Sequence, residues 1–295
     1  MSALAAELAV PPAAAASRGY WTSVFLRLLK DRVALVFAGI LLLILLAAVF
    51  APLLAPHDPF ASSILRRLKP IGTPGHLLGT DELGRDMLSR LIFGGRLSLV
   101  MGLAPVFFAF LIGTTLGIAA GFLGGWVNSA IMRTVDVFYA FPSVLLAVAI
   151  SGALGAGIAN AMLSLTIVFI PPITRVAESV TTQVRTLDFV EAARASGAPA
   201  LTIIRAHVVG NVLGPIFVYA TSLISVCMIL ASGLSFLGLG TKPPQPEWGL
   251  MLNTLRTAIF TNPWVAALPG MMIFAVSICF NLLSDSVRQA MDVTR

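Results

Sequence analysis

Charged side chains are scarce in this sequence. Of its 295 residues, 58% are hydrophobic, only 11% are Asp, Glu, Lys or Arg, and the mean hydropathy is +0.94. A soluble domain carries about 25% charged residues, so the chain lacks the polar surface that a water-soluble globule needs. The composition therefore predicts an integral membrane protein whose solvent is the lipid bilayer.

Basic clusters are also absent, although the formal net charge is +6. Lys and Arg occur one or two at a time, without the basic stripe and neighbouring aromatic residues that are typical of nucleic-acid binding. We therefore expect no nucleic-acid partner. The positive charge is better explained by membrane topology and by contact with lipid head groups.

Few residues could form a disulfide or hold a metal ion. Cys227 and Cys279 each lie within an apolar run, and no CxxC spacing occurs. The three histidines, His57, His76 and His207, are far apart in the sequence. We therefore expect neither a disulfide nor a metal site, and we expect both cysteines to be packing residues.

The sequence contains no phosphate-binding loop. Its three lysines are Lys30, Lys69 and Lys242, and none of them ends a GxxxxGK[ST] motif. An HExxH run, which would indicate a metalloprotease, is absent as well. We therefore predict that this chain has no catalytic residues and binds no cofactor of its own.

Long runs without Asp, Glu, Lys or Arg predict an all-α fold with six membrane-spanning helices, each needing roughly 20 apolar residues. The runs are Val33–Ala55, Leu97–Met132, Val137–Thr174, Ala206–Thr241 and Thr257–Ser284. The third is too long for one helix, and the glycines of SGALGAGIAN (Ser151–Asn160) predict a hairpin that divides it. The first exceeds the roughly 7–15 apolar residues of a signal peptide, so we expect it to remain as a span.

These spans divide the chain into five regions. Residues 1–30 are predicted to be a disordered cytoplasmic leader, 31–56 the first transmembrane helix, 57–96 an extracytoplasmic loop with an interfacial helix, 97–285 a five-helix core, and 286–295 a cytoplasmic tail. The interfacial helix is expected to carry Arg85, Arg90 and Arg96. If both termini are cytoplasmic, the inner segments hold 11 of the 19 Lys and Arg residues, as the positive-inside rule favours.

A polar segment, residues 186–211, interrupts the apolar pattern between the fourth and fifth spans. Asp188 and Glu191 have the spacing of a capping box, and Gly197 fits the left-handed position that ends a helix. Pro199 suits the first turn of a second helix, where its missing N–H is not needed. The segment predicts a helix, a glycine corner and a second helix on the cytoplasmic surface. From local chemistry alone, an amphipathic connector without a further role explains it equally well.

The order of residues in this segment resembles the EAA loop of ABC-importer permeases. That pattern has Glu-Ala-Ala, three residues, Gly and, farther along, a hydrophobic pair followed by Pro. Glu191, Ala192, Ala193 and Gly197 match it, and the hydrophobic pair is at 208–209. Gly210 replaces the proline, which leaves open the angle at which the chain enters the fifth span.

Other blocks resemble the dipeptide/oligopeptide/nickel subfamily of these permeases. They are GTDELGRDMLSRLIFGGRLSL (79–99), GGWVNSAIMRTVDVFYAFPSVLLA (124–147), LSFLGLGTKPPQPEWGLML (234–252) and FNLLSDSVRQAMD (280–292). The first apolar run with its exit APLLAPHDP (51–59) suits the C-type permease of a pair. The chain departs from the subfamily at Asp292-Val293, where Asp-Pro is usual.

The resemblance implies a type I importer permease with the MetI-like fold in a bacterial inner membrane. The chain would form a heterodimeric pore with a second permease, dock two ATP-binding subunits that hold ATP and Mg²⁺, and receive cargo from an extracytoplasmic solute-binding protein. Dipeptides and oligopeptides are the expected cargo, with nickel chelates, glutathione or another small solute as alternatives. No substrate-contacting residue is assigned.

The same resemblance assigns a coupling helix that inserts into the ATPase subunit and transmits its movement to the spans. The residues of this coupling loop are Glu191, Ala192, Ala193, Arg194, Ala195, Gly197, Pro199 and Arg205. Glu191 is expected to make the ionic contact to the ATPase, or only to cap its helix. The small alanines would keep the helix slim enough to seat in a cleft.

Further polar residues have two interpretations each. Asp81, Glu82, Arg85 and Asp86 would contact the binding protein outside or brace their own loop. Arg133 and Asp136 are expected to anchor the third span at the membrane interface. Small residues in the fifth span, Ser222, Ser225, Ser232 and Ser235, are expected to allow close helix packing rather than line a hydrated path.

Three other classes of protein fit the sequence less well. An ion-coupled secondary transporter usually buries ionisable residues at mid-span, whereas the long uncharged runs lack Asp, Glu, Lys and Arg. A membrane hydrolase would need a histidine or carboxylate pair at bilayer depth. A purely structural scaffold leaves the EAA-like segment unexplained.

Overall fold

The computed structural model describes residues 20–291, which form helices and no β-sheet. The α-helices are α1 (Tyr20–Leu28), α2 (Arg32–Val49), α3 (Ala51–Leu54), α4 (Met87–Leu123), α5 (Gly125–Tyr139), α6 (Ser143–Leu154), α7 (Ile158–Arg185), α8 (Asp188–Ala195), α9 (Ala200–Ile203), α10 (Val209–Phe236), α11 (Trp248–Thr254) and α12 (Pro263–Met291). Two 3₁₀ turns, η1 (Ile64–Arg66) and η3 (Ala258–Phe260), and one π-helical turn, η2 (Ile204–Val208), complete them.

Among the described residues, five helical segments are long and apolar enough to cross a membrane. They are α2, α4, α7, α12 and the continuous run Ala200–Phe236, which comprises α9, η2 and α10. Helices α5 and α6 give a sixth span if they are taken together, with a bend of 90° between them. The bend falls at Pro142, because the residue before a proline is disfavoured in the α conformation. The all-α prediction is confirmed, and six spans result when the bent pair is counted once.

Helix α4 differs from its prediction at both ends. It begins at Met87, so Arg90 and Arg96 belong to it and no separate interfacial helix precedes it. It ends at Gly124, whose φ of +67° turns the chain, so residues 125–132 belong to α5 rather than to the second span. The predicted hairpin within Ser151–Asn160 corresponds to the break between α6 and α7.

The predicted disordered leader is partly helical. Residues 20–28 form α1, which packs against α12 and buries Val24. The rest of the leader up to residue 19, and residues 292–295 of the predicted tail with the Asp292-Val293 departure, lie outside the described residues.

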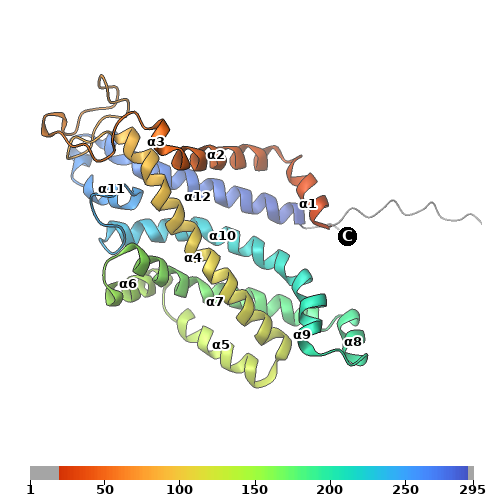
Figure 1. Cartoon of the computed structure of the whole chain (residues 1–295). Helices are drawn as coiled ribbons and strands as arrows, with labels where there is room; N and C mark the ends of the chain where they lie inside the picture. The colour runs from red at the N-terminus through yellow and green to blue at the C-terminus, as the bar shows by residue number, and fades with distance from the viewer. Residues whose placement is uncertain (1–19, 292–295) are drawn as a thin grey trace, which may run out of the picture.

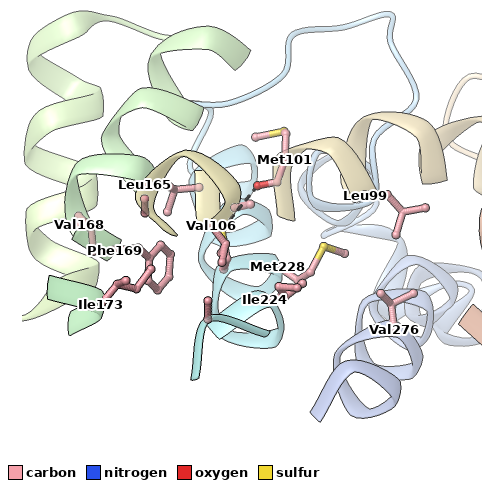
Figure 2. Packing of buried hydrophobic residues seen from close by; sticks show 14 of the residues in the cluster. Leu99, Met101, Val106, Leu165, Val168, Phe169, Ile173, Ile224, Met228 and Val276 are labelled. Carbon is pink, nitrogen blue, oxygen red and sulfur yellow. Dashed lines mark hydrogen bonds between the residues drawn. The ribbon is translucent and has the colours of Figure 1, made fainter. Parts of the chain in front are cut away.

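Helix α4 is the centre of the core. It lies between α7 on one side and α10 on the other, and Figure 2 shows its Val106 near Phe169 of α7 and Ile224 of α10. Both cysteines are buried, as predicted, and the Cys227 thiol donates to the backbone oxygen of Met101 at 3.6 Å. Apolar packing around one long helix therefore holds the spans together.

Glycines make the closest contact in this core, between α4 and α7. Gly113, Gly117 and Gly121 are four residues apart and therefore lie on one face of α4. A Cβ on Gly117 would collide with the side chain of Ala177 and lie 2.8 Å from the backbone nitrogen of Glu178. Such spacing of small residues lets two backbones approach closely in a membrane, where packing replaces the hydrophobic effect between helices.

The two ends of the molecule are built differently (Figure 1). The loop between α3 and α4 lies at one end with α11, whereas α8, α9, α1 and the end of α12 lie at the other. At the first end, Arg96 donates from Nε to the oxygen of Ala48 at 2.6 Å and from Nη2 to that of Val49 at 2.7 Å. These carbonyls end α2, so a cation from α4 satisfies the open carboxyl end of its neighbour.

Candidate functional site

The EAA-like segment forms a helix, a corner and a second helix, as predicted. Gly197 has a φ of +78° and terminates α8. Its N–H donates to the oxygen of Arg194 at 2.9 Å, and the N–H of Ala198 donates to that of Ala193 at 3.2 Å. These two bonds are the Schellman arrangement, which fixes the direction of the chain after the helix.

The predicted capping box is wrong. Helix α8 begins at Asp188, so this residue is the first helical position and Leu187 precedes it as the N-cap. Leu187 has no side-chain acceptor, and no side-chain hydrogen bond caps the helix. Asp188 and Glu191 still lie in the first turn, where their negative charge is favourable toward the helix dipole. Pro199 is likewise one position earlier than predicted, at the N-cap of α9.

One face of α8 holds the helix to the spans. Val190 is completely buried. The guanidinium carbon of Arg194 lies 5.1 Å from the ring centroid of Phe122 in the last turn of α4, and the rings of Phe189 and His207 are 6.2 Å apart. Arg194 therefore contacts this chain's own core.

The opposite face of α8 is open. Glu191, Ala192 and Ala195 are exposed, and so is Arg205 in the π-helical turn. Ala193 is half-buried against the core. The open face presents the carboxylates of Asp188 and Glu191 beside small side chains. Helix α8 lies at the end of the molecule that also holds α1 (Figure 1).

The second helix of the segment continues into the fifth span without a corner. Helix α9, the π-helical turn η2 and α10 follow one another directly. Gly210, which replaces the proline of the EAA pattern, is helical, and a Cβ there would meet nothing within 4 Å. The irregularity that a proline would introduce is present instead as the π-helical turn 204–208.

The acidic and basic residues before α4 are buried and brace their loop. Asp81, Arg85 and Asp86 are 2–4% exposed. The Asp81 carboxylate accepts from Arg85 Nε at 2.6 Å and pairs with Arg90 Nε at 3.2 Å. Of the two predicted interpretations, this geometry supports the bracing of the loop, because side chains so enclosed present almost no surface to a partner.

Burial and local hydrogen bonds shift the pKa of two carboxyl groups in this loop. Burial raises the pKa of Glu82, and the neighbouring charge of Asp81 raises it further. Burial works the same way on Asp86, but hydrogen bonds from Ser89 and His76 outweigh it and leave the pKa of Asp86 below its usual value. Asp86 is also the N-cap of α4, accepting the N–H of Ser89 at 2.8 Å.

Other predicted polar residues lie apart from both regions. Asp136 pairs with Arg175 of α7, whose guanidinium carbon is 4.6 Å from the ring centroid of Tyr139. Arg133 is exposed. Of the four serines in α10, Ser225, Ser232 and Ser235 are buried, and Ser225 donates to Asn281 of α12 at 3.1 Å, which fits the predicted packing role.

The sequence analysis did not single out several residues on which the arrangement depends. Arg175 ends the third uncharged run, and its pairing with Asp136 joins α5 to α7. The three glycines of α4 could have been found from their spacing of four. Phe122 gives no sequence signal, because its contact with Arg194 joins positions 72 residues apart.

Two family profiles match the chain. That of the binding-protein-dependent transport system inner membrane component matches residues 113–293, and that of the N-terminal transmembrane domain of oligopeptide transport permease C matches residues 19–70. The chain is 40% identical to the glutathione transport system permease protein GsiD of Pectobacterium atrosepticum, over 92% of this chain and 90% of that one. It is 42% identical to the di/tripeptide transport system permease protein DppC of Pseudomonas aeruginosa, over 85% of each.

A solved structure shares the fold. The inward-facing MetNI methionine ABC transporter superimposes with a TM-score of 0.58 at 21% identity, covering 71% of this chain and 98% of that chain. A likeness at that identity establishes the MetI-like arrangement of helices, and the sequence relatives establish the family. The chain therefore belongs to the binding-protein-dependent transport system inner membrane components, the multi-pass permeases of ABC importers.

Proposed function

We propose that this chain is the C-type permease of an importer for short peptides and forms half of a heterodimeric pore. A solute-binding protein would deliver the cargo outside, and two ATP-binding subunits would hydrolyse ATP with Mg²⁺ inside. The relatives named for dipeptides, di- and tripeptides and glutathione support this class of cargo. Chelated nickel or another small solute is the alternative.

The open face of α8 carries the proposal. Glu191 is exposed there beside Ala192 and Ala195, and the Schellman corner at Gly197 fixes the helix relative to α9. A slim helix that presents carboxylates suits a cleft on an ATPase that offers a basic residue. An ion pair that docking desolvates contributes more than an exposed pair. The chemistry of ATP hydrolysis would therefore belong to the partner, and this chain would respond to it.

The primary experiment is ATP-driven uptake of a labelled dipeptide into vesicles that hold the co-expressed complex. Glu191→Arg should abolish uptake and ATPase co-purification, because it places like charges together, and Gly197→Asp should impair both by disturbing the corner. Asp188→Asn changes a carboxylate in the same exposed turn and serves as the matched control. Uptake that survives both changes and does not need ATP would instead favour an ion-coupled transporter.

Competition assays would separate the candidate cargoes. Unlabelled dipeptide, glutathione and a nickel chelate are added in turn to the uptake assay, with the binding protein present. Displacement by peptides and not by the chelate supports the peptide importer. Displacement by the chelate alone would contradict it.

The proposed orientation places the termini and α8 in the cytoplasm. Single cysteines at Ser196 on α8 and Ser62 in the loop before α4 would test it, because both positions are exposed. The natural Cys227 and Cys279 are buried and give little background. A membrane-impermeant maleimide is applied to spheroplasts, in which the outer membrane is opened and the inner membrane is sealed. It should label Ser62→Cys and leave Ser196→Cys unlabelled. The reverse pattern would refute the orientation.

A further inference from the structure

The loop before α4 brings together two histidines that are far apart in the sequence. His57 follows α3, His76 lies in the middle of the loop, and Asp86 caps the start of α4. Their ligand atoms all lie within 4.8 Å of one another. Among residues 20–291, this is the one such group of three or more His, Cys, Asp or Glu side chains.

Both imidazoles face the same carboxylate oxygen, Oδ1 of Asp86. His76 Nδ1 lies 2.9 Å from Asp86 Oδ1, and His57 Nδ1 lies 3.7 Å from the same atom. Nitrogen and oxygen ligands of a tetrahedral Zn²⁺ are about 2.0–2.2 Å from the ion, and hence roughly 3.4 Å from one another. The two separations from Asp86 Oδ1 fall on either side of that value, and the ligand atoms of the two histidines lie within 4.8 Å of each other. Side-chain rotations would therefore bring the three groups to coordination distance.

His57 provides an independent indication of a missing ligand. Its Nδ1 is enclosed by the protein and has no hydrogen-bond partner, although the side chain as a whole is 38% exposed. An enclosed polar atom without a partner costs free energy. A cation between His57 and Asp86 would supply that partner.

The carboxylate is already oriented by its neighbours. Asp86 Oδ2 accepts from the backbone N–H of Ser89 at 2.8 Å and from its hydroxyl at 2.7 Å, which leaves Oδ1 facing the imidazoles. The backbone N–H of His57 donates to the same hydroxyl at 3.1 Å. Ser89 therefore positions two of the three ligands, as outer-shell residues commonly do in metal sites.

Arg66 indicates which ring nitrogen of His76 carries the proton before an ion binds. Its Nη1 lies 3.3 Å from His76 Nε2. A guanidinium can only donate, so in this arrangement Nε2 accepts and Nδ1 carries the proton that is given to Asp86. A cation bound at Nδ1 would require the proton to sit on Nε2, so Arg66, which is exposed, would turn into solvent. Binding at Nδ1 would therefore change the tautomer of His76 without a net release of a proton.

We propose that His57, His76 and Asp86 bind one divalent transition-metal cation of the Zn²⁺ type, with water completing the coordination. Two imidazoles and one carboxylate suit Zn²⁺, Co²⁺ or Ni²⁺, whereas Mg²⁺ and Ca²⁺ require mainly oxygen ligands. The ion would tie the end of α3 and the middle of the loop to the first turn of α4. Its role is structural, and it is independent of the cargo.

The test uses the full-length chain, purified with a histidine-free tag and stripped with a chelator. Zn²⁺ is added back and quantified by elemental analysis, and Co²⁺ is titrated optically to detect its visible bands. The wild type should bind one ion per chain and gain thermal stability. His57→Ala should lose the Co²⁺ bands, and it should still fold because His57 is only half-buried.

Two further variants make the result specific. Ser89→Ala keeps all three ligands and should weaken metal affinity about 10- to 100-fold, as loss of an outer-shell partner does. His207→Ala removes the remaining histidine, which lies at the other end of the molecule beside α8, and should bind as the wild type does. The proposal would be overturned if His57→Ala and a His57→Ala/His76→Ala double variant both bind metal as the wild type does. It would also be overturned if the wild type binds no more metal per chain than the double variant.

Discussion

Arg194 of α8 lies over the ring of Phe122, with 5.1 Å between the guanidinium carbon and the ring centroid. Phe122 is buried in the last turn of α4, and α4 is the helix around which the core packs. The same turn receives Arg185 of α7, whose Nη1 donates to the oxygen of Phe122 at 3.4 Å. Phe122 therefore contacts α8 through Arg194 and α7 through Arg185.

Arg194→Ala should reduce uptake per ATP hydrolysed without releasing the ATPase. A cation–π contact at an exposed site contributes about 0.5–1 kcal/mol, which corresponds to about a two- to fivefold change in the coupled population. The measurement is the ratio of peptide transported to ATP hydrolysed in vesicles. Arg194→Lys keeps a cation, so its ratio of transport to hydrolysis should fall between those of the wild type and of Arg194→Ala. If Arg194→Ala instead releases the ATPase, the residue contacts the partner and not only Phe122.

Gly197→Ala should destabilise the corner, although there is space for the added carbon. A Cβ would meet nothing within 4 Å, but the φ of +78° is unfavourable for any residue with a side chain, by about 1 kcal/mol. Gly210→Ala is the matched control, because a Cβ there also meets nothing within 4 Å, but the residue lies inside α10. At a helical position alanine is more favourable than glycine by up to about 1 kcal/mol. Thermal unfolding of the purified chain should shift in opposite directions for the two variants. Equal shifts would show that the left-handed corner does not matter.

The membrane spans could be predicted because lipid imposes a one-dimensional rule on sequence, namely long runs without charge. The rule failed at the start of α4, where Arg90 is buried within a helix. Its Nη1 donates to the oxygen of Pro59 at 3.0 Å, and its Nε pairs with Asp81. A charge satisfied by a distant loop looks the same in sequence as one in water, so a count of charges placed the start of the helix too late in the sequence.

The corner at Gly197 could be predicted because glycine at a left-handed position is a local signal. The N-cap was misplaced because Leu187 has no side-chain acceptor and a neighbouring aspartate looked like the better cap. The histidine cluster could not be found from spacing at all. His57 and His76 meet only because the loop between them folds back, with ring centroids 4.8 Å apart, and such contacts depend on tertiary structure.

Gly117→Val should severely destabilise the chain, because it separates α4 from α7. A Cβ on Gly117 would lie 2.6 Å from the backbone oxygen of Thr174, and backbone cannot move aside as a flexible side chain can. Overpacking of a core costs about 1–3 kcal/mol, and a branched side chain here should reach the upper part of that range or prevent folding. Gly39→Val is the control, since nothing lies within 4 Å of a Cβ at that position of α2. Comparable yields and melting temperatures for the two variants would contradict the close α4–α7 contact.

Glu82→Gln should stabilise the chain at neutral pH and have little effect in acid. Burial and the charge of Asp81 raise the pKa of Glu82 in the folded chain, and its Oε2 is buried without a partner. A raised carboxyl pKa means that the folded state binds the proton more tightly, so stability is greatest below the unfolded pKa and decreases as pH rises through the folded value. Glutamine cannot ionise, so the variant should not lose stability in this way as pH rises.

The measurement is the melting temperature of Glu82→Gln and of the wild type at a series of pH values above and below the folded pKa of Glu82. The advantage of the variant should grow as Glu82 ionises in the wild type. Asp58→Asn removes an exposed carboxylate from the same loop and controls for the general effect of charge. If Glu82→Gln is the less stable protein at neutral pH, the 3.2 Å ion pair with Arg85 outweighs the cost of burying the charge.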